Sequence, residues 1–182
     1  MSPFSPTRKM TLTAVCMALC VVLPIAFHMV PNAGPIFLPM HIPVLLCGLV
    51  CGWPYGMLCG LLGPLLSSVL TGMPMAPVLP SMMVECAAYG AVAGGMMKLV
   101  HTSSAYGDLY VSLPTAMLAG RFLAGITKAL VFAPGTGLRA WVMASFVTAL
   151  PGIVIQLAAL PTLAVLLSKA GLIPNRYPKK SL

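Results

Sequence analysis

Long apolar runs, broken by short stretches that are rich in proline, glycine or polar residues, make up most of the chain. Most of these runs approach the roughly 20 residues that an α-helix needs to cross a bilayer, although the second is shorter. Their positions predict six membrane-spanning helices, at about residues 10–29, 42–53, 55–70, 81–100, 112–133 and 150–169. We therefore expect a single all-α transmembrane domain over residues 1–182, with the six helices in one bundle.

Three of the breaks are rich in proline and glycine and yet mostly apolar. They occupy residues 31–40, 71–80 and 134–149, and a short helix is an option from residue 139 onward. With six spans these loops share one side of the membrane, opposite the polar connector at 101–108. Irregular backbone near membrane depth is tolerated only where it is buried in protein or lines a cavity. The loops are therefore predicted to cover an outward pocket.

Composition supports a membrane protein. Hydrophobic residues make up 59% of the chain and charged residues only 7%, and the mean hydropathy is +1.00. A soluble domain carries about 25% charged residues, which it needs to cover its surface. This composition excludes a soluble enzyme, a secreted disulfide scaffold and a disordered chain.

The charge distribution predicts the orientation. The net charge is +8, and Glu85 and Asp108 are the two acidic residues. Most cations flank the apolar runs, so they indicate membrane orientation rather than nucleic-acid binding. The side with both termini and the 101–108 connector carries Arg8, Lys9, Lys98, Lys169, Arg176, Lys179 and Lys180, whereas the other side carries Arg139. Because positive residues accumulate inside, both termini are predicted to be cytoplasmic.

Small residues recur every four positions in several spans. The glycines at 48, 52, 56 and 60 and the pair Gly90 and Gly94 are interpreted as internal packing positions, because small residues let helices approach closely. Ala14 and Ala18 repeat the spacing in the first span, where they either pack internally or face a partner. The six cysteines lie in apolar runs without a CxxC motif, so they too indicate packing, and no metal site is predicted.

Three charged residues fall inside the predicted spans: Glu85, Arg121 and Lys128. Each is costly at a helix centre, so it is expected to face a cavity or a partner. Glu85 and Lys128 lie at similar depth, and Arg121 lies about 10 Å deeper on the face that it shares with Lys128. Either Glu85 and Lys128 form a structural ion pair while Arg121 binds backbone carbonyls, or these residues hold a polar ligand with an anionic group.

Three further residues are candidates for ligand contact. His41 lies at the mouth of the second span, where it either contacts ligand or bonds a loop. Gln156 lies midway along the last span, where its amide needs a partner. Asn32 belongs to the first outer loop and is otherwise a turn former. Trp141 and Phe146 either cap the pocket or lie at the membrane interface.

Several segments together resemble one transporter family. They are Arg8-Lys9-x-Thr11-x-x-Ala14-x-x-x-Ala18-Leu19, Met40 to Leu46, Gly52-Trp53-Pro54-Tyr55-Gly56, Ala119-Gly120-Arg121 and Pro151 to Leu157. With the length and six predicted spans, they make the chain similar to the substrate-binding S components of energy-coupling factor (ECF) transporters, which import vitamins. The resemblance covers essentially the whole chain and names no substrate.

The resemblance implies a mechanism and partners. An S component binds a vitamin in an outward pocket, docks on a transmembrane T component with two ABC-type ATPases, and topples to deliver the vitamin inward. The family's AxxxA motif, which meets the T component, matches Ala14 and Ala18, whereas its third small position is Val22 here. The chain has no GxxxxGK[ST] motif, so ATP is expected to be used by the partner subunits.

We therefore expect a transport subunit without enzymatic activity, cofactor or metal of its own. Two other interpretations stay open. One is a structural or assembly subunit that binds no ligand. The other is a membrane-embedded enzyme, which would need a cluster of catalytic groups that two acidic residues hardly supply. For the transport subunit we expect a small water-soluble vitamin or precursor as substrate, and pantothenate-like, pyridoxine-like and other compounds stay open.

Overall fold

A computed structural model describes residues 5–27, 33–102, 104–129 and 138–173. Every regular element in these ranges is helical. The elements are α1 (Pro6–Phe27), α2 (Ala33–Phe37), α3 (His41–Cys51), α4 (Trp53–Thr71), α5 (Leu79–Leu99), α6 (Ala105–Thr127), α7 (Leu138–Val142), the π-helical segment η2 (Met143–Thr148) and α8 (Leu150–Lys169). The prediction of an all-helical protein is confirmed for the described part of the chain.

Four helices, α1, α4, α6 and α8, are long and apolar enough to cross a membrane. Six spans are therefore not confirmed. The 11 residues of α3 are apolar but rise only about 17 Å, about half of a typical hydrocarbon core. The 21 residues of α5 are long enough but less hydrophobic, because Glu85, Tyr89 and three glycines replace larger apolar side chains.

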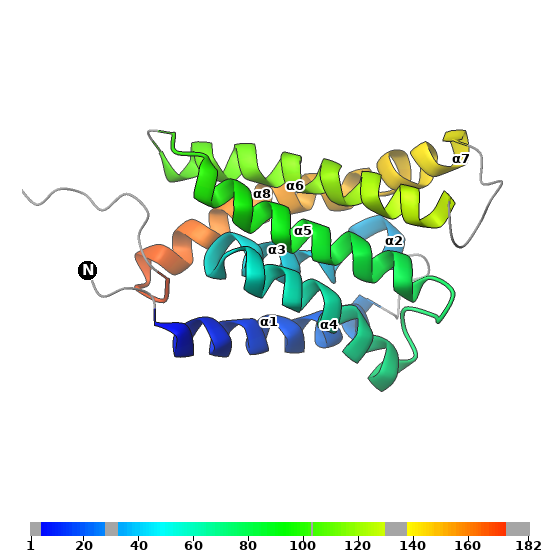
Figure 1. The fold of residues 1–182 in the computed structure, drawn as a ribbon, viewed down its shortest axis with the longest axis horizontal. Helices are drawn as coiled ribbons and strands as arrows, with labels where there is room; N and C mark the ends of the chain where they lie inside the picture. The colour runs from blue at the N-terminus through cyan, green and yellow to red at the C-terminus, as the bar shows by residue number, and fades with distance from the viewer. Residues whose placement is uncertain (1–4, 28–32, 103, 130–137, 174–182) are drawn as a thin grey trace, which may run out of the picture.

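The longer helices run along a common direction, and the connections gather at two ends (Figure 1). We call the end with α2, the turn between α4 and α5, and α7 the loop end. The start of α1, the connection from α5 to α6, and the end of α8 lie at the opposite, terminal end. The described parts of the three Pro/Gly-rich loops thus share one end of the bundle, as the sequence predicts.

One helix begins well before its predicted start. The sequence predicts a connector at 101–108 and a fifth span from about residue 112, but α6 begins at Ala105. The Ser104 hydroxyl caps it by accepting a hydrogen bond from Gly107 N–H at 3.0 Å. The buried Asp108 carboxylate accepts two more, from the Thr102 N–H at 2.6 Å and hydroxyl at 2.8 Å. These polar residues form a helix start, not an extended loop.

Short helices also occur in the outer loops. The loop predicted at 31–40 contains α2, and the segment after residue 137 forms α7 and η2. The short helix considered from residue 139 is thus present, as α7 followed by a π-helical turn. These elements matter because they place backbone carbonyls at the loop end of the bundle.

The glycines pack α3, α4 and α5 against one another. A Cβ added at Gly56 would lie 2.5 Å from the Gly90 carbonyl oxygen, and one added at Gly48, Gly60 or Gly94 would also overlap backbone atoms. The internal packing predicted for these positions is confirmed. Gly52 differs, because its φ of 96° makes the turn from α3 to α4, a conformation that glycine adopts readily.

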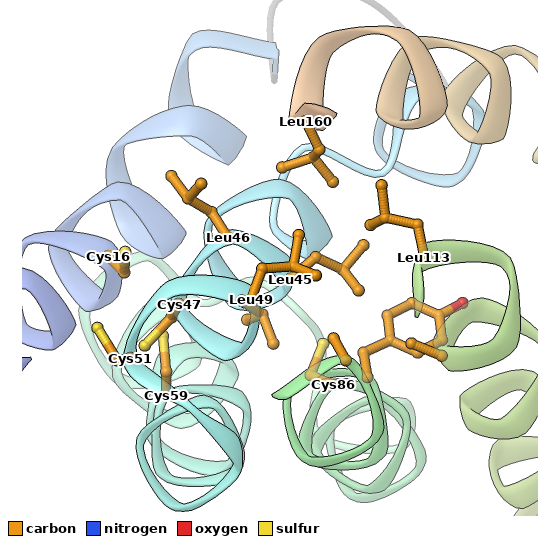
Figure 2. Close-up of a cluster of buried hydrophobic side chains, with 14 of the residues drawn as sticks. Cys16, Leu45, Leu46, Cys47, Leu49, Cys51, Cys59, Cys86, Leu113 and Leu160 are labelled. Carbon is orange, nitrogen blue, oxygen red and sulfur yellow. The ribbon is translucent and has the colours of Figure 1, made fainter. Parts of the chain in front are cut away.

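The core beside this contact is rich in sulfur and leucine. All six cysteines are buried as free thiols. Cys16 of α1, Cys47 and Cys51 of α3 and Cys59 of α4 lie close together in Figure 2. The Cys47 thiol lies 3.5 Å from the Thr13 hydroxyl of α1. Packing is therefore the role that the structure shows for these residues. The close-packed helices hold the first residue of α3 and the first half of α5 in fixed positions.

Candidate functional site

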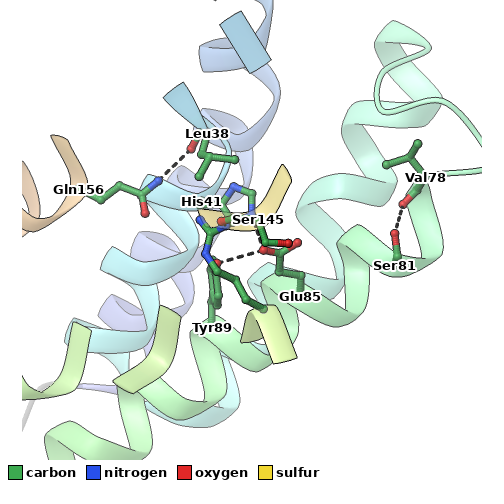
Figure 3. A network of polar contacts seen from close by, with 9 residues as sticks. Leu38, His41, Val78, Ser81, Glu85, Tyr89, Ser145 and Gln156 are labelled. Carbon is green, nitrogen blue, oxygen red and sulfur yellow. Dashed lines mark hydrogen bonds and ion pairs between the residues drawn. The ribbon is translucent and has the colours of Figure 1, made fainter. Parts of the chain in front are cut away.

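A group of polar side chains lies among the helices near the loop end. We call it the loop-end cluster. Figure 3 shows its members His41 of α3, Glu85 and Tyr89 of α5 and Gln156 of α8. Arg121 of α6 is its fifth member, because it is hydrogen-bonded to Ser145, which lies beside them. The side chains of all but Glu85 are buried, and Glu85 is 16% exposed. The structure thus brings together four of the six predicted substrate-binding residues, from four helices.

Glu85 contacts two neighbouring side chains, which also contact each other. Its Oε1 accepts a hydrogen bond from the Tyr89 hydroxyl at 3.0 Å, because residues four apart share a helix face. The same oxygen lies 3.8 Å from His41 Nε2, and the His41 and Tyr89 rings lie 5.1 Å apart. Neither ring nitrogen of His41 has a hydrogen-bond partner among the described residues. His41 is therefore buried, and its contact with Glu85 is longer than a hydrogen bond.

Arg121 is 3% exposed. Its Nη1 donates a hydrogen bond to the Ser145 carbonyl oxygen of η2, and its guanidinium lies 5.6 Å from the centre of the Phe146 ring. The carbonyl bond matches the structural alternative for Arg121. However, Nε and Nη2 have no partner within the described ranges, so one bond leaves most of this buried cation unsatisfied.

Gln156 connects α8 to the loop end. Its Nε2 donates a hydrogen bond to the Leu38 carbonyl oxygen at 3.3 Å, whereas its Oε1 has no partner in the part of the chain that the structure describes. Close packing supports this contact, because a Cβ at Gly152 would lie 2.6 Å from the Ile36 carbonyl oxygen of α2. The amide thus has a donor in use and an acceptor available.

Sequence reasoning missed two residues of this region. Tyr89 is the hydrogen-bond partner of Glu85, and Gly120 faces the Tyr89 ring so closely that an added Cβ would overlap it. The spacing of four between Glu85 and Tyr89 was the available signal. For Gly120 the sequence offers only its position beside Arg121.

The remaining predicted residues are placed differently. Lys128 is exposed at the end of α6, and no ion pair joins it to Glu85 among the described residues, so the predicted proximity is not seen. Its role in ligand binding stays a prediction. Asn32 lies outside the described residues. Trp141 packs edge-on against Phe146, with ring centres 5.8 Å apart, beside the Arg121 contact.

Ala14 and Ala18 are exposed on α1. The opposite face of the helix carries its buried residues, which are Thr13, Cys16, Cys20 and Pro24. Internal packing, the alternative considered for the two alanines, is therefore not what the structure shows. The pair lies on an outer surface of the bundle.

A cavity of about 300 Å³ opens at the terminal end, away from the loop-end cluster. Its walls come from the ends of α3, α5 and α8 and the start of α6, and include Leu49, Met97, Leu109, Val165 and Lys169. It is mostly apolar and lies at the end that is predicted to be cytoplasmic. The unsatisfied polar groups described above belong to the other end.

The comparisons with known proteins agree with the resemblance in the sequence. The family model described as "ECF transporter, substrate-specific component" matches residues 8–165, which is most of the chain and includes the whole loop-end cluster. The comparison with curated proteins finds no match. The chain therefore belongs to the family of substrate-specific components of ECF transporters, and is a membrane-embedded subunit of a transporter.

Proposed function

We propose that this chain captures a small water-soluble vitamin or vitamin precursor from outside the cell and passes it inward. It works with a T component and two ABC-type ATPases, which use the ATP. Family membership supports the general role of a substrate-binding subunit. The vitamin substrate, the T component and the two ATPases are what we propose beyond that role.

The observation that carries this proposal is the set of unsatisfied polar atoms in the loop-end cluster. His41, Arg121 and Gln156 are buried, and each has at least one polar atom without a hydrogen-bond partner among the described residues. Leaving a buried donor or acceptor unpaired costs about 1–3 kcal/mol, and more for a charged group. A polar ligand at this site would compensate for that cost.

The proposed orientation places the loop end outside. Lys9, Lys98 and Lys169 lie near the terminal end, in agreement with an inner side rich in cations. Both termini are then cytoplasmic, and Ser181→Cys should react with an impermeant thiol reagent only after the membrane is permeabilised. Labelling in intact cells would reverse the orientation and move the cluster to the inner side.

The exposed alanines of α1 support a contact with the T component. Small side chains let another helix approach closely in a bilayer, where apolar burial gives little drive for association. Ala14 and Ala18 leave such a surface open on the outside of the bundle. The ATPase motor is supplied by separate chains in this proposal, so the subunit needs no cofactor of its own.

The test measures binding and transport separately. The full chain is purified in nanodiscs, co-purifying small molecules are identified by mass spectrometry, and binding of radiolabelled vitamins is measured. Uptake is then measured in cells that also express a T component and two ATPases. We expect binding by the chain alone and uptake only with active ATPases. A protein that binds no vitamin would be an assembly subunit, and one that converts the vitamin would be an enzyme.

Lys128 is tested in the same assays. If it lines the mouth of the pocket, Lys128→Met should weaken binding by roughly ten- to a hundredfold, because a hydrogen bond to a charged group is worth about 1.5–3 kcal/mol. Its exposure predicts little change in the melting temperature without ligand. Unchanged binding would remove Lys128 from the proposed site and leave the loop-end cluster in place.

A further inference from the structure

One nitrogen of the Arg121 guanidinium has a hydrogen-bond partner among the described residues, and the other two nitrogens have none. Nη1 is bonded to the Ser145 carbonyl, and the Phe146 ring lies beside the group, so its orientation is fixed. The open atoms are Nε and Nη2, whose N–H groups point the same way along one edge of the guanidinium. Their spacing matches the two oxygens of a carboxylate, which arginine binds in this bidentate manner.

We propose that the substrate is a monocarboxylate, and that Arg121 binds its carboxylate through Nε and Nη2. This inference rests on the proposed function, because it assigns a substrate class to the same cluster. It follows from a buried cation whose two parallel donors have no partner among the described residues.

Among the residues that the structure describes, no carboxylate reaches this edge. Glu85 and Asp108 are its two acidic residues. Glu85 is engaged by Tyr89 and lies near His41, and no ion pair joins it to Arg121 in the described residues. Asp108 lies 13 residues before Arg121 on α6, about 20 Å away along the helix axis, and binds Thr102. We therefore assign the anion at this edge to a bound molecule.

The same cluster favours a single negative charge over a phosphate. Glu85 carries a carboxylate close to the site, so a dianion would add like-charge repulsion in a poorly solvated environment. The single positive charge of Arg121 balances the single negative charge of a monocarboxylate. Phosphorylated compounds are thus expected to bind more weakly than carboxylates of similar size.

The other open atoms indicate what else the substrate carries. Gln156 Oε1 is an unpaired acceptor among the described residues. The Glu85 carboxylate is a second acceptor nearby, of which Tyr89 bonds Oε1. Both suit hydroxyl or amide N–H donors. The substrate class is therefore a carboxylate that bears hydroxyl or amide groups within a small molecule.

The test compares matched acids and neutral analogues. Thermal stabilisation and calorimetric binding of the full chain in nanodiscs are measured with nicotinate and nicotinamide, biotin and biotinamide, lipoate and lipoamide, and pantothenate and panthenol. Riboflavin, pyridoxine and pyridoxal phosphate complete the panel. We expect one acid to stabilise the protein and its neutral analogue to bind at least about tenfold more weakly, because one charged pair of hydrogen bonds is lost.

Variants assign the effect to the arginine. Arg121→Lys keeps the charge but loses the two-pronged geometry, and it should weaken binding of the acid by about tenfold or more. Arg121→Gln should weaken it further, by about a hundredfold, and should abolish the preference for acid over neutral analogue. Arg139→Lys and Arg139→Gln are matched controls at an exposed arginine of α7, and both should bind like the wild type.

A second readout separates binding from a structural role. Arg121→Gln removes a buried, largely unsatisfied cation, so the melting temperature without ligand should stay the same or rise. If both Arg121 variants lower it sharply, and Arg121→Lys keeps the wild-type affinity and acid preference, Arg121 is structural and the inference is overturned.

The inference and the proposed function fail in different ways. If riboflavin or pyridoxine stabilises the wild type and Arg121→Gln equally, the substrate is not a carboxylate held by Arg121, and the vitamin-binding function stands. If no acid, neutral analogue or other vitamin in the panel binds, the proposed function fails and the inference fails with it.

Discussion

Two sets of small residues with the same spacing have opposite positions in this protein. The glycine seam, which comprises Gly48, Gly56, Gly60, Gly90 and Gly94, lies inside the bundle between α3, α4 and α5. The alanine face, which comprises Ala14 and Ala18, lies on the outside of α1. Spacing alone shows that a helix is adapted for close approach. Burial shows whether the approaching helix belongs to the same chain.

The difference has a physical basis in the Cβ atom. In the glycine seam, backbone meets backbone, so an added Cβ would overlap main-chain atoms that cannot rotate away. On the alanine face a Cβ is already present, and no helix of the described chain covers it. The internal seam tolerates no side chain, whereas the outer face accommodates small ones, as expected for helices that meet and separate.

The largest effect is expected from Gly90→Ala in the seam. The new Cβ would overlap the Gly56 backbone, which forces α4 and α5 apart. Overpacking typically costs about 1–3 kcal/mol, and a clash of backbone with a fixed Cβ belongs at the upper end of that range. The measurement is unfolding of the purified protein by denaturant titration in mixed micelles.

The matched control is Gly95→Ala on the same helix, because no atom lies within 4 Å of a Cβ added there. Alanine is favoured over glycine in a helix, so this variant should gain about 0.5–1 kcal/mol. Equal stability of the two variants would mean that α4 and α5 are farther apart in the membrane than in the structure.

The next effect concerns transport rather than stability. Replacing Ala14 and Ala18 together with leucine should abolish uptake in cells with a complete transporter, because the bulky side chains would hold the T component away. Vitamin binding by the isolated subunit should be unchanged, and its stability should change by no more than about 0.5 kcal/mol at exposed positions. Uptake and binding are measured on the same protein preparation and expression strain.

A control pair on another helix tests the specificity of this face. Ala158 and Ala159 are exposed on α8, and replacing both with leucine should leave uptake and binding intact. Loss of both binding and uptake in the α1 variant would show that its alanines pack within the bundle after all. Loss of uptake in the α8 variant alone would move the partner surface to α8.

Much of the fold could be predicted from hydrophobicity, because apolar runs and their breaks set where helices begin and end. The bounds of α8 match the prediction, and those of α4 and α5 agree within two residues. The start of α6 could not be found in this way, because Ser104 and Asp108 are polar residues that cap a helix rather than interrupt one. The number of spans depends on α3 and α5, which are short or weakly apolar.

The sequence could predict most residues of the candidate site but not the contacts between them. An ionisable residue inside an apolar span has a high energetic cost in the membrane, and this cost identifies Glu85 and Arg121 as candidates. Their partners depend on how the helices rotate and cross, so the depth argument paired Glu85 with Lys128, whereas the structure pairs it with His41 and Tyr89. Such contacts come from packing that a one-dimensional pattern does not contain.

The smallest effect is expected at Val22, which continues the alanine face four residues after Ala18 and is 56% exposed. Val22→Ala completes a row of three small residues. Stability should change by no more than about 0.5 kcal/mol, because nothing within the described chain packs tightly there. A gain of similar size in the free energy of docking, about 0.5 kcal/mol, changes the affinity for the T component by little more than twofold. Uptake at limiting T component is the sensitive measurement, with Val22→Leu, which enlarges the side chain, as the control. A large fall in uptake with Val22→Ala would show that the partner contacts the valine side chain itself. The outer face would then be recognised by its shape and not by the small size of its side chains.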